Sequence, residues 1–347
     1  MTDNRPVQRA NPAPPVMLDV ARLAGVSHQT VSRVINGQTN IRPETRARVE
    51  EAIRRLGYRP NTAARALVTR RSATIGVIGT EAGLWGPTSI QRTIEHAARQ
   101  ANYFVSSVNL DAVTRQELSA AIDHLLSQSV EGIIMIAAHD EALDVVHSQD
   151  PVVPFVVVEG DLSKSRWTAG VDQVAGARLA TRHLIELGHS EILHVTGPLN
   201  WTEARARQDG WRSEMFAVGL RPGEPIHGDW TAESGFAAGA RILARRDVTA
   251  VFAANDQMAL GVLRALFETG LRVPEDISVV GFDDIPEAAY LIPPLTTIRQ
   301  DFPAVGRRAI EVLQAAITHR TESLPRLIDP ELIVRVSTAP PRRKSNQ

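Results

Sequence analysis

Residues 18–37 read LDVARLAGVSHQTVSRVING, and their pattern is that of two short helices joined by a sharp turn. Gly25 stands where the chain has to turn, because glycine enters positive φ without a Cβ penalty. Ser27 is placed to accept a hydrogen bond from the first turn of the second helix. This stretch therefore predicts a helix-turn-helix. The apolar residues that recur at helical spacing are Val20, Ala21, Ala24, Val31 and Val34.

A third helix is predicted to follow directly. Pro43 suits its first turn, and Gly57 suits the position just after its end. The apolar residues of its buried face are Val49, Ala52, Ile53 and Leu56.

The second helix has a polar face opposite its valines. The side chains on that face, which could reach base edges or phosphates, are His28, Gln29, Ser32 and Arg33. A three-helix bundle with no DNA role fits the same helical pattern. Residues 1–71 hold thirteen arginines against five acids, a balance of +8, whereas the whole chain carries −1; this charge indicates either an anionic partner for that end or a solvated basic surface.

The chain changes character from Thr74 onward, where short apolar strands alternate with amphipathic helices. Strands that are apolar nearly throughout predict parallel sheets covered by helices on both faces, and their number favours two α/β lobes. Residues 1–15, rich in proline and without an apolar period, are predicted to be a disordered tail. The predicted strands are 74–80, 103–110, 132–137, 155–160, 191–197, 248–256 and 277–284, and the predicted helices include 90–101 and 177–188.

Several classes of protein are disfavoured by what the sequence lacks. It has no cysteine, no apolar run of about 18 residues and no apolar leader, so we expect a cytoplasmic protein without disulfides. It has no nucleophile elbow, phosphate-binding P-loop or zinc-protease motif, so we expect no enzyme activity and no cofactor. His183, His189 and His194 are spaced six and five apart, which does not place them on one helical face, and we expect no metal site.

The N-terminal string continues as TRARVEEAIRRLGYRPNTAARALVTRRSATIGVI, and in this form it resembles the LacI-type repressor family. The resemblance runs from about residue 16 to 338. Later motifs that carry it, in the family's order, are VTGPL (195–199), GDWTAESGF (228–236), ANDQMALG (254–261), ISVVGFDD (277–284) and IPPLTTIRQDF (292–302).

The resemblance implies specific DNA contacts. His28 and Gln29 take the base-reading positions, and residues 61–68 match a hinge helix that enters the minor groove. Leu67 matches a residue that wedges between base steps, with Ala64 beside it, and such a wedge kinks the duplex. The full implied set is Leu18, Ser27, His28, Gln29, Thr30, Ser32, Arg33, Asn36, Tyr58, Asn61, Ala64 and Leu67.

For the rest of the chain the resemblance implies two Rossmann-like lobes of the periplasmic-binding-protein type. The chain would cross between the lobes near residues 171, 299 and 329, and a ligand would lie between them at the strand ends. The implied segments are a tail 1–15, a helix-turn-helix domain 16–60, a hinge and linker 61–72, an effector-binding and dimerisation domain 73–340 (N-lobe about 73–171 and 300–329, C-lobe about 172–298 and 330–340) and a disordered tail 341–347.

A sugar effector requires planar polar partners for its hydroxyls and an aromatic face for its C–H surface. The resemblance implies that Arg207, Asn255 and Asp283 are the polar partners of the hydroxyl groups. It implies that Trp230 is the aromatic face and that Phe302 forms an apolar wall. The full implied set is Thr80, Trp85, Ile90, Glu159, Trp201, Arg207, Trp230, Asn255, Gln257, Asp283 and Phe302.

The chain departs from the family pattern at several of these positions. Trp201, Glu203 and Ile136 stand where small hydroxyl or amide side chains are found, and Glu159 and Thr80 replace an aspartate and a serine. The implied effector is therefore a sugar, with a galactoside, another glycoside such as a glucoside, and a larger oligosaccharide all left open.

These implications combine into a homodimeric repressor of carbohydrate-utilisation genes. It would bind a pseudo-palindromic double-stranded operator and leave it when the sugar binds, with no membrane partner. Two alternatives remain: a sugar-binding protein without a transcriptional role, and a repressor that uses its ligand as a corepressor.

Overall fold

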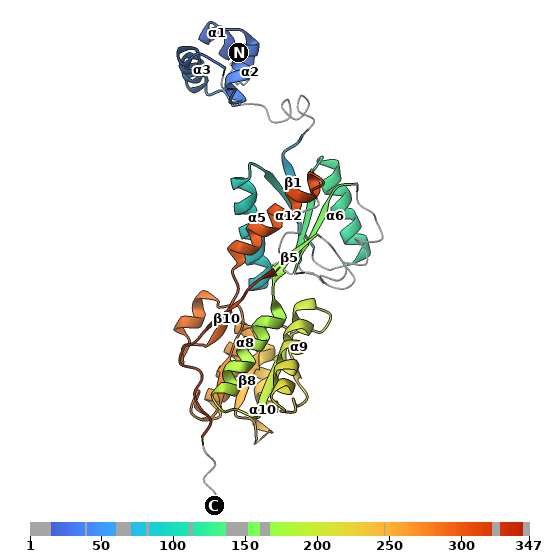
Figure 1. Cartoon of the computed structure of the whole chain (residues 1–347), viewed down its shortest axis with the longest axis vertical. Helices are drawn as coiled ribbons and strands as arrows, with labels where there is room; N and C mark the ends of the chain where they lie inside the picture. Colours follow the sequence, from blue (N-terminus) through green and yellow to red (C-terminus); the bar gives the residue numbers. More distant parts are fainter. Residues whose placement is uncertain are drawn as a thin grey trace, which may run out of the picture. The chain divides into compact units, whose positions relative to one another are not determined.

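The computed structural model describes residues 15–38, 40–59, 71–80, 83–110, 114–136, 152–159, 167–245, 247–320 and 327–342. The chain forms two compact units, residues 1–72 and 73–347 (Figure 1). The predicted hinge at 61–68 and nearly all of the two predicted tails lie outside the described residues. No helix of the described part is long and apolar enough to cross a membrane.

The first unit is the predicted three-helix headpiece, with α1 (Met17–Ala24), α2 (His28–Ile35) and α3 (Pro43–Leu56). Gly25 and Gly57 end α1 and α3 in the left-handed region, at φ 63° and 62°. The Ser27 hydroxyl accepts a hydrogen bond from the Thr30 N–H at 3.2 Å, which confirms the predicted cap. The core is apolar apart from one phenol and comprises Val20, Ala21, Ala24, Val31, Val34, Val49, Ala52 and Tyr58.

The N-lobe of the second unit is built on a parallel six-stranded sheet of order β11-β5-β4-β3-β1-β2. Helices α5 (Trp85–Gln100) and α12 (Phe302–Ile317) cover one face, with the even-numbered residues of β3 and β4 beneath them. Helix α6 (Arg115–Ser127) covers the other face over the odd-numbered residues. The strands are β1 (Thr74–Thr80), β2 (Phe104–Leu110), β3 (Ile133–Ile136), β4 (Phe155–Val158), β5 (Thr168–Val171) and β11 (Leu327–Ile328).

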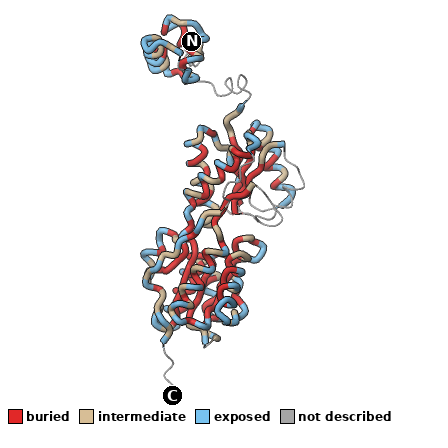
Figure 2. The backbone as a smooth tube through the Cα atoms, viewed as in Figure 1, coloured by how far each residue is buried: buried red, intermediate tan, exposed pale blue. Residues whose placement is uncertain are grey.

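The C-lobe repeats this layering on a parallel four-stranded sheet of order β7-β6-β8-β9. Helices α8 (Gln173–Glu186) and α9 (Thr202–Ala217) pack on one face, and α10 (Ala232–Leu243) and α11 (Asp256–Glu268) on the other. Figure 2 shows buried backbone running through both sheets, as parallel sheets require. The strands are β6 (Ile192–Thr196), β7 (Ile226–His227), β8 (Ala250–Ala253) and β9 (Ser278–Val280).

The chain passes between the lobes at three places. β5 leads into α8, β11 leads into β12 (Glu331–Ile333), and β10 (Thr297–Arg299) leads into α12. β10 and β12 pair antiparallel beside the C-lobe, and a 3₁₀ helix spans Pro286–Tyr290. These connections bring side chains from distant parts of the sequence to the junction of the lobes.

All seven predicted strands are present, and β8 and β9 fall furthest short of their predicted ends. β8 stops at Ala253 and β9 at Val280, because the polar residues that follow start a helix and a loop. The two named helices begin earlier than predicted, at Trp85 and Gln173. β5, β7, β10, β11 and β12 were not predicted, since two to four residues are too few for a period-2 pattern.

Candidate effector pocket and DNA-binding surface

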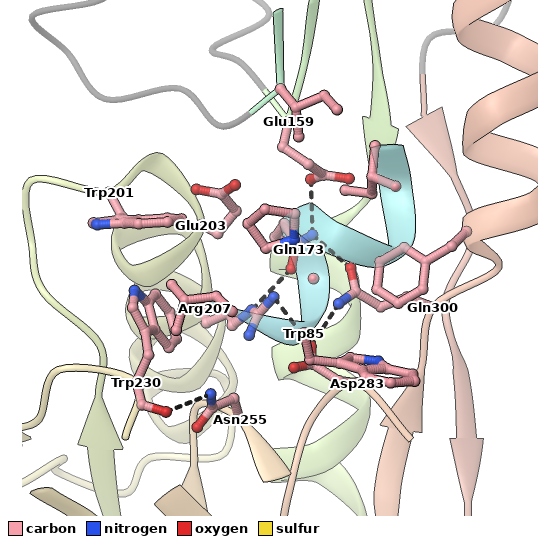
Figure 3. Close-up of a pocket in the computed structure, with 16 residues that line it drawn as sticks. Trp85, Glu159, Gln173, Trp201, Glu203, Arg207, Trp230, Asn255, Asp283 and Gln300 are labelled. Atoms are coloured by element: carbon pink, nitrogen blue, oxygen red, sulfur yellow. Dashed lines mark hydrogen bonds and ion pairs between the residues drawn. The ribbon is translucent and has the colours of Figure 1, made fainter. Parts of the chain in front are cut away.

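A pocket with about 510 Å³ of empty space, its open mouth included, lies where the strand ends of the two lobes meet (Figure 3). This is the usual place for a ligand in α/β folds. The described lining residues are Leu84, Trp85, Gly86, Pro87, Ile90, Ile136, Glu159, Gln173, Trp201, Glu203, Arg207, Trp230, Asn255, Asp283, Gln300 and Phe302.

Gln173 lies at the centre of a polar network on the pocket floor (Figure 3). Its Nε2 donates to Glu159 Oε2 at 2.8 Å and to Gln300 Oε1 at 2.9 Å, and its Oε1 accepts from Arg207 Nε at 2.9 Å. Gln300 Nε2 in turn donates to Asp283 Oδ1 at 2.6 Å. The network joins residues of both lobes, so it holds the floor at a fixed geometry.

Arg207 is buried and has a partner on each side. Its guanidinium lies 3.7 Å from Asp283 Oδ1 and donates to the backbone carbonyl of Ala254. Its Cζ atom sits 3.9 Å from the ring centroid of Phe282 and 5.5 Å from that of Trp230. A buried cation held by a carboxylate and two aromatic rings is a directional hydrogen-bond donor that water cannot screen.

The backbone is strained at three lining residues. Glu159, Trp230 and Asp283 are non-glycine residues with φ of 61°, 76° and 113°. Two neighbouring glycines leave room for these side chains: a Cβ at Gly197 would lie 2.3 Å from the Trp230 ring, and one at Gly170 would lie 3.2 Å from the Glu159 carboxyl. Strain of about 1–3 kcal/mol per residue persists where the surroundings over-determine it, which is typical of ligand sites.

Three buried polar atoms in the lining have no hydrogen-bond partner within the described part of the chain. They are Glu203 Oε2, Trp85 Nε1 and Trp230 Nε1. A buried polar atom without a partner is costly, so each is a position that a polar ligand would satisfy. One acceptor and two donors around a cavity suit a molecule with several hydroxyl groups.

The carboxyl groups of the pocket titrate at unusually high pH. Burial, together with the charge of Glu159, raises the pKa of Glu203 to about 8. Burial raises the pKa of Glu159 to about 7, against hydrogen bonds from Gln173 and Val171. Burial raises the pKa of Asp283 to about 6, although Arg207 and Gln300 oppose the shift. The pocket therefore retains protons near neutral pH.

The headpiece presents polar side chains on the outer face of α2. Ser27, His28, Gln29, Arg33 and Asn36 are exposed. Thr30 and Ser32 are half-buried, and each bonds to a neighbour: Thr30 to Ser27, and Ser32 to Asn36. An exposed polar helix face beside an apolar core is the geometry that places a helix in the major groove.

Comparison with known proteins identifies this combination of units. Residues 16–61 match the family model "Bacterial regulatory proteins, lacI family", and residues 181–338 match "Periplasmic binding protein-like domain". The lactose operon repressor of Escherichia coli strain K12 is 36% identical over 336 residues, which cover 96% of this chain and 93% of that protein. The chain belongs to the LacI family.

Relatives of known structure within the LacI family share the fold. A lac repressor dimer bound to operator and the anti-inducer ONPF superposes with a TM-score of 0.84 at 35% identity, over 94% of this chain and 99% of that one. The CelR–cellobiose complex superposes with a TM-score of 0.70 at 33% identity, over 93% and 99%. The regulator CelR of Thermobifida fusca is 36% identical over 337 residues. The predicted helix-turn-helix headpiece and two-lobed α/β fold are confirmed.

The pocket of this LacI-family chain brings together nine of the eleven effector residues implied by the sequence. Thr80 does not line it, because its hydroxyl is buried against the carbonyl of Ile136 at 3.4 Å. Gln257 does not line it either, and its Oε1 instead accepts from Asn255 Nδ2 at 3.0 Å. Asn255 also caps α11 by accepting from the Met258 N–H, so it has a structural role beside its place in the lining.

Two central lining residues, Gln173 and Gln300, were not among the expected site residues. Both follow a strand at a crossing between the lobes, and this position is the one signal in the sequence that could have found them. In the headpiece Tyr58 is 7% exposed and packs in the core, so its ring is structural, whereas Leu18 is 56% exposed. Asn61, Ala64 and Leu67 lie outside the described residues.

Proposed function

We propose that this LacI-family protein is a transcriptional repressor that dissociates from its operator when a sugar occupies the pocket. The observation that carries the proposal is the pocket floor: one buried network of amide, carboxylate and guanidinium groups beside three tryptophans. Fixed polar groups orient adjacent hydroxyls, and an aromatic ring covers the C–H face of a pyranose. The same chain carries a headpiece suited to the major groove.

The proposed effector is a glycoside with a glucose-type or galactose-type ring. CelR, a similar protein, has been solved with cellobiose, and the lac repressor with ONPG. Trp201 and Trp230 stand edge to face with ring centroids 5.7 Å apart, so the pocket has two aromatic walls. Both a one-ring glycoside and a two-ring ligand, such as a β-linked disaccharide, could use these aromatic surfaces.

On DNA, we propose that two protomers read two half-sites of a pseudo-palindrome. His28 and Gln29 would contact bases, while Ser27, Thr30, Arg33 and Asn36 would contact phosphates or neighbouring bases. The proposed hinge at 61–72 includes Leu67 as the wedge, with Asn61 and Ala64 beside it, and connects a DNA-binding domain at 16–60 to an effector and dimerisation domain at 73–340. Acting on chromosomal DNA would place the protein in the cytoplasm, as a regulator and not an enzyme.

A sugar panel tests the proposal in two steps. First, cellobiose, lactose and their monosaccharides are screened for a rise in melting temperature, because a ligand of the native state stabilises it. A sugar that binds is then added to a retardation assay on operator DNA selected from random duplexes. Release of the operator is expected. If the sugar tightens operator binding, it acts as a corepressor. If the chain shows no sequence-selective DNA binding, it is a sugar-binding protein without a transcriptional role.

A further inference from the structure

Two carboxyl groups, those of Glu159 and Glu203, lie at the same end of the pocket, and neither forms an ion pair with a described residue (Figure 3). Glu159 follows β4, and its carboxyl accepts from the Val171 N–H at 2.9 Å and from Gln173. Glu203 stands in the first turn of α9, is 7% exposed, and leaves Oε2 without a partner. The same two residues also line a second hollow that extends along α8 and β5. The pair therefore stands where the two hollows meet.

The lining residues that the structure describes carry three carboxyl groups and one cation. Arg207 is the cation, and it lies against Asp283. The formal charge of the lining is thus −2 when Glu159 and Glu203 are ionised. Charge without a counter-charge is expensive to bury, and the pair repel each other. A ligand with a positive charge near Glu159 and Glu203 would offset the cost of burying their charges and the repulsion between them.

The surroundings of Glu203 suit a cationic group of a ligand. Trp201, two residues earlier in the chain, lies beside it in the pocket, and Trp230 stands edge to face with Trp201. Aromatic faces attract cations, and the attraction is larger in a site sheltered from water. Arg205 and Arg207 influence Glu203 electrostatically, but Arg205 donates to the Leu199 carbonyl and Arg207 to the network on the floor. Among the described residues, none satisfies Glu203 Oε2.

We propose that the effector is an amino sugar, whose ammonium group is bound by Glu203 with Glu159 beside it and Trp201 against it. This inference rests on the proposed function, because it names the chemical class of the sugar. Arg207, Asp283 and Gln300 then orient the hydroxyl groups of the ring, as they would for a neutral sugar. Glu203 is the residue that distinguishes an ammonium group from a hydroxyl group.

Calorimetric titration of the full chain tests this with matched glycosides. The probes are methyl 2-amino-2-deoxy-β-glucoside and methyl 6-amino-6-deoxy-β-glucoside, each compared with methyl β-glucoside at pH 7. At least one amino probe is expected to bind about 30-fold more tightly than the neutral one, which is what a buried charge pair typically contributes. Titration in two buffers of different ionisation enthalpy is expected to show release of about one proton with the amino probe and none with the neutral one, since an empty Glu203 holds its proton at pH 7.

Glu203→Gln is expected to remove the preference and the proton release, so that the amino probe and the neutral glucoside bind this variant with similar affinity. Asp209→Asn removes an exposed carboxyl from the same helix and is expected to change neither. Equal or tighter binding of the neutral glucoside by the native chain would overturn the inference and leave the proposed function standing. Absence of binding by every probe and by the sugar panel would overturn both.

Discussion

The headpiece and the pocket handle polar side chains in opposite ways. In the described part of the headpiece no charged residue is buried, and most of the candidate DNA contacts lie on or beside the surface of α2. In the pocket Glu159, Glu203, Arg207 and Asp283 are all buried, and three of the four are bound into one network. The polar groups proposed to bind DNA are therefore hydrated in the headpiece, whereas those proposed to bind the sugar are buried in the pocket.

Because of this difference, a substitution in the headpiece can change DNA binding without changing stability. A substitution in the pocket is expected to change ligand binding and stability together. A hydrated side chain on α2 can be removed at little cost to folding, because its loss leaves no buried partner. Removing a buried member of the pocket network leaves its partners unsatisfied, so stability and ligand binding change together. Substitutions in the two units test this contrast.

The largest effect is expected from Arg207→Ala. It removes the counter-charge of Asp283 and the donor to Gln173 and Ala254, which is expected to cost about 3–5 kcal/mol of unfolding free energy. Sugar binding should be lost while operator affinity is retained. Denaturant unfolding and a retardation assay measure the two effects. The control Arg264→Ala removes an exposed pair with Glu268 and should cost less than about 1 kcal/mol; loss of operator binding in Arg207→Ala would show that the units are not separable.

The second prediction concerns pH. Burial raises the pKa of Glu203 to about 8 in the folded chain, above its ordinary value of 4.5, so the native state holds a proton that the unfolded chain has lost. Raising the pH between those values therefore favours unfolding. The Glu203 contribution is expected to lower the unfolding free energy by about 2 kcal/mol from pH 6 to pH 8.

Glu203→Gln should remove that part of the pH dependence, which denaturant unfolding at the two pH values measures. Glu159, whose pKa is raised to about 7, contributes with the same sign and remains in the variant. Arg205 and Arg207 oppose the shift of Glu203 and are unchanged. An unaltered pH profile in Glu203→Gln would show that Glu203 is ionised in the empty pocket.

The contrast also explains how far the sequence could be interpreted. Gly25, Ser27 and Pro43 act within one turn of their own helix, so local spacing sufficed to predict the headpiece. The pocket depends on residues that are distant in sequence: Gln173 and Gln300 meet across 127 positions.

Resemblance to a family supplied Arg207 and Asp283, but not the glutamines that connect them. The Thr80 hydroxyl donates to the carbonyl of Ile136 and does not face the pocket. The hydrophobic periodicity of a strand cannot predict which hydrogen-bond partner a side chain takes. The open oxygen of Glu203 likewise follows from three-dimensional packing alone.

A smaller effect is expected from Gln29→Ala on α2. Gln29 is exposed, so folding should be unaffected, while loss of a base contact should weaken specific operator binding about tenfold. Binding to scrambled duplex should stay unchanged at each salt concentration, because phosphate contacts carry that term. Arg33→Ala is the informative comparison, since loss of a phosphate contact weakens both kinds of binding and lowers the salt dependence. If Gln29→Ala weakens binding to the operator and to the scrambled duplex equally, Gln29 contacts the DNA backbone and not a base.

The smallest effect compares the same helix cap in the two units. Ser27 accepts from the N–H of Thr30, and Thr114 accepts from the N–H of Glu117, both at 3.2 Å. Each alanine variant should cost about 1 kcal/mol. If the units fold independently, Ser27→Ala should lower only the headpiece transition, seen by hydrogen exchange in α2, and Thr114→Ala only that of the N-lobe, seen in α6. A fall in α2 protection on Thr114→Ala would mean that headpiece and body unfold as one cooperative unit, and the contrast between hydrated and buried recognition would then not extend to stability.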